Sequence, residues 1–281
     1  MARFETAPAR PSVSRRGWLR RAALLIGLLG AGCGLVLAAI YWRQESLLFD
    51  PAPLPAEHVF SLPDVHEVRI EVDGASLSAL HLKLPNPRGV VFFLHGNSGN
   101  LATWFTNAAF YRNANYDLFM IDYRGYGKSS GRIASQAQLR ADVRQAWDWL
   151  APQYAGKKRV IYGRSLGTAL AAGLSADVPA DLTVLVSPYC SMTDLMRANY
   201  PLLPTLLLRY PLPTCEYVAR LHTPLLLVHG EADSVIPIAH SEKILALAPQ
   251  AQLLRIPGAG HNDVHQFAAY IEALTRCLRA L

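Results

Sequence analysis

The chain has 281 residues, of which 51% are hydrophobic and 17% are charged, a composition that excludes a disordered protein and fits one α/β domain. The formal net charge is +6, but residues 1–43 hold seven arginines and one acid and so carry the whole excess. Residues 44–281 hold the other 20 basic and 20 acidic residues (27 − 7 and 21 − 1), so the charge of this body gives no support to nucleic-acid binding.

The N-terminal region predicts a membrane anchor. Residues 1–21 form a basic tail, and residues 22–42 contain no charged residue, which gives the roughly 20 apolar positions that a helix needs to cross the hydrocarbon core. Trp18, Tyr41 and Trp42 flank this run as interfacial aromatic residues do. Because arginines precede the run, the positive-inside rule places the N-terminus in the cytoplasm and the body across the membrane, in the periplasm if the protein is bacterial.

Other interpretations of this segment involve export and cleavage. The stretch SRRGWLR at residues 14–20 resembles a twin-arginine signal, but the same arginines also orient an anchor, which is the interpretation we favour. A lipoprotein signal is a weaker match because Gly30, three residues before Cys33, is not leucine-like. A cleaved signal peptide is also a weaker match, because the apolar run is longer than a signal-peptide core.

The four cysteines form no CxxC pair, so the spacing of a zinc site is absent. Cys33 lies in the apolar run, and Cys277 lies near the C-terminus. Cys190 and Cys215 flank one segment and could form a disulfide in an oxidising compartment. Two isolated buried thiols are the open alternative.

The body predicts one domain over residues 64–281, preceded by a proline-rich linker at 43–63 that packs onto it. Alternating patterns at 66–72 and 77–84, joined by Asp73-Gly74, predict a hairpin. Continuous apolar runs then predict parallel strands buried on both faces. These runs are residues 90–94, 118–121, 160–162, 184–186, 225–228 and, interrupted by Arg255, 253–256.

Helical segments separate the strands, near residues 101–113, 135–151, 166–175, 240–248 and 263–279. A hairpin followed by this alternation predicts a doubly wound, mostly parallel sheet. Residues 188–222 interrupt the alternation with a segment rich in proline, leucine and tyrosine. We expect a short cap over the C-terminal edge of the sheet there, or else a long helical connection that covers the sheet.

The stretch VIYGRSLGTAL at residues 160–170 places Ser165 between two glycines, where a predicted strand meets a predicted helix. Gly163 and Gly167 allow a tight turn that holds the serine exposed at the sheet edge, as a nucleophile requires. The backbone N–H of Leu166 then lies at a helix N-terminus, where it can bind an oxyanion. An ordinary turn serine is the competing interpretation.

A serine hydroxyl needs a base, and the base needs an orienting acid. Asp233 follows the strand at 225–228, and His261 follows the strand at 253–256, so both lie in loops at the same sheet edge as Ser165. The chain order of serine, acid and histidine is the one this architecture uses.

Several residues compete for these roles. Asp194 is the alternative acid, and Glu231 is expected to be solvated. His265 lies four residues after His261, a metal-ligand spacing, but no HExxH motif or carboxylate cluster accompanies it, so we expect no metal. His95 and His229 precede glycines and are expected to shape turns.

The loop HGNSGN at residues 95–100 follows the first long parallel strand. The second oxyanion donor comes from this loop in such sheets, and the backbone N–H of Asn97 is our candidate. A glycine-rich turn before a helix is the structural alternative. Arg164 and Tyr126 are expected either at the entrance to the site or on the surface.

Together, the segments HGNSGN, DYRGYGKSSG, GRSLG, HGEADSVIP and GAGHND resemble the signatures of the α/β-hydrolase superfamily. Their order and spacing resemble its membrane-anchored Bem-type branch, which is related to the serine aminopeptidase-like hydrolases, from about Gln44 to the C-terminus. The resemblance implies an eight-stranded sheet. It also implies that Ser165 is the nucleophile, Asp233 the acid and His261 the base, with Asn97 and Leu166 as oxyanion donors.

We therefore expect a serine hydrolase that cleaves an ester or thioester of a small acyl or lipid-like substrate through an acyl-enzyme, with no metal or other cofactor. One alternative is a peptidase or amidase of the same fold, although no acidic pair is placed to hold a substrate amino terminus. The other is a noncatalytic, membrane-tethered binding protein, which would have no need of serine, acid and histidine together.

Overall fold

The computed structural model describes residues 15–281, so the first 14 residues of the expected basic tail lie outside the described residues. The chain divides after Gln44 into two compact units, which are described separately. In the first unit, helix α1 (Arg15–Trp42) forms from leucine and alanine, which favour helix, and its glycines are too few to interrupt it. The stretch Arg16–Trp42 is long and apolar enough to cross a membrane. A signal sequence meets the same criteria of length and composition.

The second unit, Glu45–Leu281, is built on an eight-stranded sheet with the order β10-β9-β8-β7-β4-β6-β3-β2. The hairpin strands β2 and β3 are antiparallel, and β3 also pairs antiparallel with β6, while all the remaining pairs are parallel. This is the predicted mostly parallel sheet. The strands are β2 (Val65–Val72), β3 (Ala75–Leu82), β4 (Gly89–Leu94), β6 (Tyr116–Ile121), β7 (Lys158–Arg164), β8 (Leu182–Val186), β9 (Leu225–Gly230) and β10 (Ala251–Ile256).

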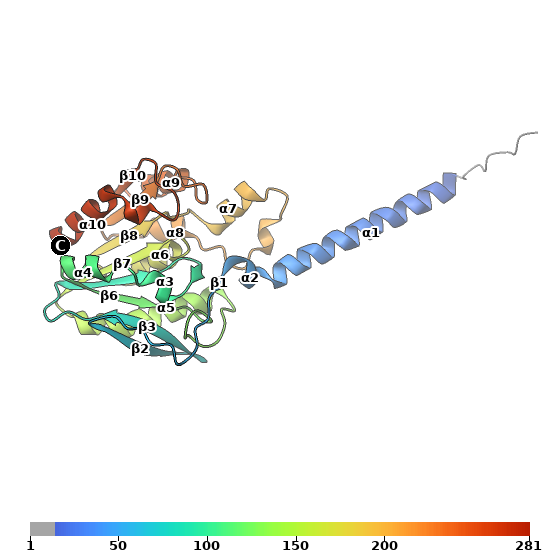
Figure 1. The fold of residues 1–281 in the computed structure, drawn as a ribbon. Helices are drawn as coiled ribbons and strands as arrows, with labels where there is room; N and C mark the ends of the chain where they lie inside the picture. The colour runs from blue at the N-terminus through green and yellow to red at the C-terminus, as the bar shows by residue number, and fades with distance from the viewer. Residues whose placement is uncertain (1–14) are drawn as a thin grey trace, which may run out of the picture. The chain divides into compact units, whose positions relative to one another are not determined.

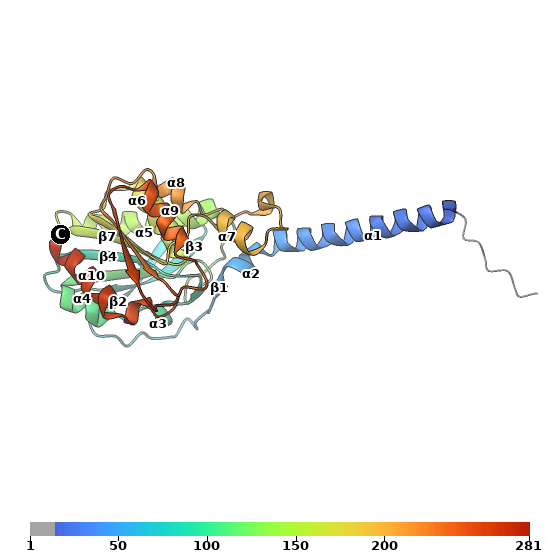
Figure 2. The same ribbon diagram turned by 90° about the horizontal axis from the view of Figure 1, so that it is seen from above.

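Helices cover both faces of the sheet (Figures 1 and 2). One face carries α5 (Gln136–Leu150), α6 (Gly167–Asp177), α8 (Thr214–Val218) and α9 (Ala239–Leu247). The other carries α3 (Leu101–Trp104), α4 (Ala108–Ala114) and α10 (Ala268–Ala280), with the short helix η3 (Val264–Gln266) before it. In β4, Val90 and Phe92 face the first layer and Val91 and Phe93 face the second, which explains the continuous apolar run.

The helix expected at 101–113 is divided into α3 and α4. The side-chain oxygen of the capping Asn100 accepts a hydrogen bond from the N–H of Ala102, and the Thr103 hydroxyl donates to the Asn100 carbonyl. The indole N–H of Trp104 donates to the Ser98 carbonyl at 2.7 Å. These bonds hold α3 to the loop that precedes it, and a second helix, α4, begins after Asn107.

Residues 45–54 do not form a loose connection. Helix α2 (Gln44–Leu48) leads into the two-residue strand β1 (Asp50–Pro51), which pairs parallel with β5 (Ser98–Gly99) in a small separate sheet. Residue Pro53 then bridges to Gly127. The segment immediately before the hydrolase core is therefore bound into the second unit.

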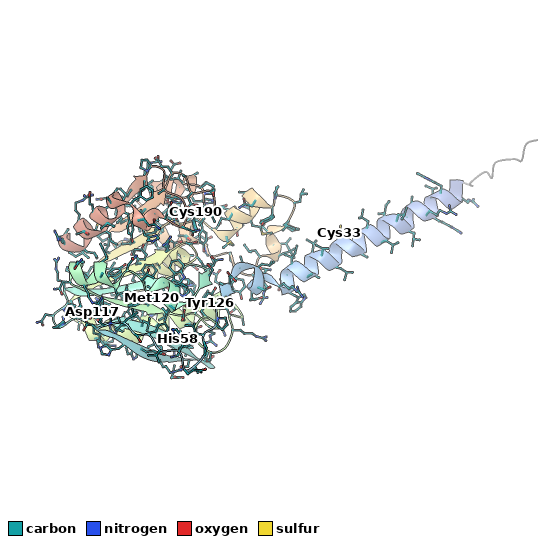
Figure 3. All side chains as sticks on the ribbon, viewed as in Figure 1. Cys33, His58, Asp117, Met120, Tyr126 and Cys190 are labelled. Atoms are coloured by element: carbon teal, nitrogen blue, oxygen red, sulfur yellow. A yellow bond between two sulfur atoms is a disulfide. The ribbon has the colours of Figure 1, made fainter. Side chains whose placement is uncertain are left out.

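The segment 188–222 contains three short helices. Helix α7 (Met192–Asn199) and the short helix η2 (Thr205–Leu207) form an excursion, whereas α8 packs back on the sheet layer that contains α6 (Figure 1). A disulfide joins Cys190, labelled in Figure 3, to Cys215, and so ties the two ends of the excursion together. Cys33 and Cys277 are free.

Candidate active site

The site lies at the carboxyl ends of adjacent parallel strands. The strands β4 and β7 pair directly, with Leu94 opposite Gly163, and β8 follows β7 in the sheet. After β4 the chain connects to β6 on one side, and after β6 it returns to β7 on the other side of β4. Such a reversal point is where open α/β sheets bind ligands. The loops that carry Asn97 and Ser165 leave the sheet there.

Ser165 occupies the turn between β7 and α6 with a φ of 51°. This left-handed backbone conformation is energetically unfavourable for any residue other than glycine. Its N–H donates to the Val186 carbonyl on β8 at 2.9 Å. The flanking glycines make the turn possible. A Cβ at Gly163 would lie 2.4 Å from the Gly167 carbonyl oxygen, and one at Gly167 would lie 2.1 Å from the Leu94 carbonyl oxygen.

The structure brings Ser165, His261 and Asp233 into one hydrogen-bond chain. His261 Nε2 lies 3.0 Å from Ser165 Oγ, and His261 Nδ1 lies 2.8 Å from Asp233 Oδ2. An ionised carboxylate only accepts, so Nδ1 carries a proton and Nε2 is left to accept the serine proton. These contacts span 96 and 28 residues of sequence, and loops after β7, β9 and β10 supply the three side chains.

Asp233 is held as a carboxylate. Burial opposes its ionisation, but hydrogen bonds from His229, His261 and the Ile236 N–H outweigh burial and hold the pKa of Asp233 well below its usual range. The Asp233 Oδ1 atom accepts from the N–H groups of Val235 and Ile236 at 3.0 and 2.8 Å. The carboxylate is thereby fixed with Oδ2 toward His261.

His229 supports this arrangement rather than shaping only a turn. Its Nε2–H donates to the Ile236 carbonyl at 2.7 Å and lies 3.4 Å from Asp233 Oδ2, and its Nδ1 contacts the Ser241 hydroxyl at 2.7 Å. The ring is fully buried. The spacing of His229 and Asp233 four residues apart was the only sequence signal that could have suggested it.

The loop after β4 adjoins Ser165. A Cβ added to Gly96 would lie 3.6 Å from Ser165 Cβ and 3.0 Å from the Trp104 ring, so Gly96 permits the close approach. Within residues 15–281, the backbone N–H groups of Asn97 and Leu166 donate no hydrogen bond. Both predicted oxyanion donors therefore have unused N–H groups beside the serine.

His95 orients the peptide that carries the Asn97 N–H. Its Nδ1–H donates to the Gly96 carbonyl at 2.7 Å, and the C=O and N–H of a trans peptide point in opposite directions, so this bond sets the direction of the Asn97 N–H. His95 Nε2 lies 3.6 Å from Asp122 Oδ1. Burial lowers the pKa of His95 to about 4 and raises the pKa of Asp122 to about 8, so burial favours the neutral form of each side chain.

Arg164 and Tyr126 hold the loops that carry His261 and Asn97, respectively. The Arg164 guanidinium donates to the carbonyls of His261 and Asn262 at 3.2 and 3.0 Å and stacks over Trp104 at 5.3 Å. Tyr126, labelled in Figure 3, donates to the Asn97 carbonyl at 2.5 Å and is fully buried. Both expectations for Tyr126, the entrance and the surface, are therefore wrong, because its hydroxyl is used inside the domain.

The competing residues have other surroundings. Asp194 lies on α7, and its N–H donates to the hydroxyl of Ser191, which caps that helix. Glu231 is exposed, as expected. Burial, together with the Arg164 guanidinium 3.2 Å from Nδ1, lowers the pKa of His265. Within residues 15–281, no three His, Cys, Asp or Glu side chains gather as a metal site.

A cavity of about 360 Å³ lies between α3–α4 and η3–α10. Its lining includes Arg164, which directly precedes Ser165, and also Trp104, His265, Tyr162 and Tyr270. The hydroxyls of these two tyrosines contact each other at 2.8 Å. The cavity thus borders Arg164, whose guanidinium binds the His261 loop.

Fold and site define a class of protein, and comparisons with known proteins agree. The family model described as "Serine aminopeptidase, S33" matches residues 85–217. An uncharacterized protein of Mycobacterium tuberculosis is 33% identical over 250 residues, which are 85% of this chain and 86% of that protein. The chain belongs to the α/β-hydrolase superfamily and is a hydrolase of that type, with a small-molecule substrate.

Other relatives and solved structures agree with this assignment. Human alpha/beta hydrolase domain-containing protein 17B is 32% identical over 199 residues, 68% of this chain and 66% of that protein. Aho-3 of Caenorhabditis elegans, another alpha/beta hydrolase domain-containing protein, is 35% identical, over 68% of this chain and 58% of its own length. An esterase of Pyrococcus furiosus shares the fold, with a TM-score of 0.67, 20% identity, and coverage of 83% of this chain and 97% of that one.

Proposed function

We propose that the protein is a serine hydrolase that cleaves an acyl ester or thioester through an acyl-enzyme on Ser165. The observation that carries this proposal is the unbroken chain from Ser165 Oγ through His261 to the buried Asp233 carboxylate, with contacts of 3.0 and 2.8 Å. A turn serine has no need of such partners. The positive φ of Ser165 adds support, because strain of this kind collects at functional sites.

In the proposed reaction, His261 Nε2 removes the Ser165 proton as Oγ attacks the acyl carbon. The Asn97 and Leu166 N–H groups stabilise the oxyanion of the tetrahedral intermediate. The protonated His261 then gives its proton to the leaving alcohol or thiol, and the acyl group stays on Ser165. Water attacks this acyl-enzyme with His261 again as base, which releases the acid and restores the serine.

The test is hydrolysis of ester and thioester panels by the full chain, beside matched amides. Ser165→Ala is expected to lower kcat by up to ~10⁶, whereas the control Ser234→Ala, an exposed serine beside Asp233, should keep the parent rate. Faster turnover of the amides would favour the peptidase alternative. If the folded parent turns over none of these substrates and Ser165→Ala keeps the cellular role of the protein, the noncatalytic binding protein would be favoured.

A lipid-like acyl group is the substrate that the cap favours. Leu206 on η2 is 85% exposed, so its side chain is not needed to pack the domain. Leu206→Gln is expected to shift the preference for acyl-chain length without lowering the unfolding temperature. Leu247→Gln on α9, 47% exposed, is the matched control. An unchanged chain-length preference in folded Leu206→Gln would count against a role for the cap in substrate choice.

The proposed location follows from α1, the apolar stretch and the arginines before it. We place the N-terminus in the cytoplasm and the catalytic domain on the far side of the membrane, with α1 as an uncleaved anchor. The disulfide between Cys190 and Cys215 supports an oxidising compartment for the domain. A cysteine-reactive, membrane-impermeant reagent that reaches Cys277 from the cytoplasmic side would contradict this topology.

A further inference from the structure

The segment Glu45–Leu54, which we name the entry segment, forms one edge of the candidate oxyanion loop. The Asp50 N–H donates to the Asn97 carbonyl at 2.9 Å, and the Ala52 N–H donates to the Gly99 carbonyl at 3.0 Å. These are the bonds of the β1–β5 pair, in which Asp50 lies opposite Ser98. The loop that supplies the Asn97 N–H is thus paired, strand to strand, with residues 48 positions earlier (98 − 50).

The other side of the entry segment is bound as well. Gly127 N–H donates to the Ala52 carbonyl at 3.2 Å, and the Leu54 N–H donates to the Gly127 carbonyl at 2.8 Å. The Asn100 side-chain amide also donates to the Ala52 carbonyl at 2.8 Å. The entry segment therefore lies between the loop at residues 97–100 and the turn at Gly127, and hydrogen bonds to both set its position.

The start of the entry segment is bound to the cap. Glu45 accepts from the Tyr210 hydroxyl at 2.7 Å and from Arg209 Nη1 at 3.1 Å. Phe49 packs edge-on against the Tyr210 ring at 5.2 Å. One stretch of ten residues consequently contacts both the cap and the loop beside Ser165.

The Asn97 N–H lies in the peptide plane before Asn97 Cα, and the peptide plane after Cα fixes the course of the loop that carries it. The plane before Asn97 Cα is held by the His95 bond to the Gly96 carbonyl, at 2.7 Å. The plane after it is held at the Asn97 carbonyl by the Asp50 N–H and the Tyr126 hydroxyl. With both planes held, the backbone dihedrals at Asn97 are fixed, since these are the only soft torsions there.

We propose that the entry segment is a positioning element of the active site: its strand pairing holds the oxyanion loop in the arrangement needed for acyl transfer. The inference rests on the proposed function and adds to it a part of the chain outside the hydrolase motifs. Hydrolytic activity should survive removal of the α1 anchor and should be lost on removal of the entry segment, although only a few residues separate Trp42 from Glu45.

The test compares two alanine-to-proline variants of the full chain. Ala52→Pro deletes the N–H that binds the Gly99 carbonyl. Ala56→Pro is the matched control, since Ala56 is also exposed and its N–H donates no hydrogen bond within residues 15–281. Ala56 is the second residue of a turn that the His58 N–H closes on the Pro55 carbonyl at 3.0 Å, a position that proline favours. Each is measured for kcat and KM on an ester that the parent hydrolyses, for binding of a boronic acid, and for unfolding temperature.

We expect Ala52→Pro to lower kcat about 10- to 100-fold while KM changes less than about twofold, because a misplaced oxyanion donor weakens the transition state more than the bound substrate. The boronic acid, which forms a tetrahedral adduct with the serine, should lose affinity by the same factor as kcat/KM. Ala56→Pro should match the parent. A purely structural role would lower the unfolding temperature and the fraction of active protein without changing kcat per active site.

If Ala52→Pro does not fold, replacement of Ala52 by lactic acid provides the second variant, because the backbone ester lacks the N–H and keeps the side chain. Parental kcat and boronic-acid affinity in either folded variant would overturn the inference while the proposed function stands. A parent that neither hydrolyses esters nor binds the boronic acid would overturn both.

Discussion

Arg164 connects the turn of the proposed nucleophile, Ser165, to the loop of the proposed base, His261. It precedes Ser165 in the chain, and its guanidinium donates to the carbonyls of His261 and Asn262. A shift of about 1 Å between reacting groups can cost ~10²-fold in rate, so bonds that set the His261 position matter even though they touch no substrate.

Arg164→Ala is therefore expected to lower kcat by about 10- to 100-fold with little change in KM. Steady-state kinetics test this, with Arg140→Ala as the control. Arg140 pairs with Asp177 at 2.8 Å and takes no part in the site. Equal kcat values for Arg164→Ala and the parent would show that the His261 loop needs no such brace.

The buried carboxyl of Asp122 predicts a pH dependence of stability. Burial raises the pKa of Asp122 from its ordinary 3.8 to about 8. The folded protein then binds a proton that the unfolded chain releases above pH 4, so the stability contributed by Asp122 is present at low pH and is lost as the pH rises toward 8.

Asp122→Asn cannot ionise and keeps an acceptor for the Leu101 N–H, which Asp122 Oδ1 binds at 3.0 Å. Its free energy of unfolding should therefore rise relative to that of the parent between pH 5 and pH 8, by at most about 1.4 kcal/mol per pH unit. Urea denaturation at each pH measures the difference, and the exposed Asp148→Asn is the control. A pH-independent difference would mean that Asp122 is already ionised in the fold.

At the scale of elements, the disulfide between Cys190 and Cys215 closes a loop over a sequence separation of 25 residues. A cross-link of this span restricts the unfolded chain and is worth about 3–4 kcal/mol in the chain-entropy model. Cys190→Ala with Cys215→Ala should lower the free energy of unfolding by about that amount. Cys277→Ala, a free thiol, is the control. Equal stability of the double variant and the parent in nonreducing conditions would show that the bond does not form in solution.

The sequence and the structure agree best where local pattern decides the element. Continuous apolar runs located the parallel strands, and the order of Ser165, Asp233 and His261 located three loops at one sheet edge. The pairing of Asp50 with Ser98 could not be predicted, because residues 50–51 lie among prolines and carry no strand pattern. The contacts of Arg164 with the His261 loop also escaped prediction, since they join residues nearly 100 positions apart.

At the scale of the whole molecule, the chain consists of an apolar helix and a compact unit that begins at Glu45. Deletion of residues 1–42 should move the protein from the membrane fraction to the soluble fraction and keep kcat on a water-soluble ester within about twofold of the parent, since the site groups described above all belong to the unit that begins at Glu45. Deletion of residues 1–54 should lose activity. Membrane association that survives the shorter deletion would show that α1 is not the anchor.

The central claim, that Ser165 is an activated nucleophile, is tested most directly by covalent labelling of the full chain with a fluorophosphonate. We predict rapid labelling that maps to Ser165, none in Ser165→Ala, and strongly slowed labelling in His261→Ala. A folded parent that stays unlabelled, or a label that persists in Ser165→Ala, would contradict the proposed mechanism.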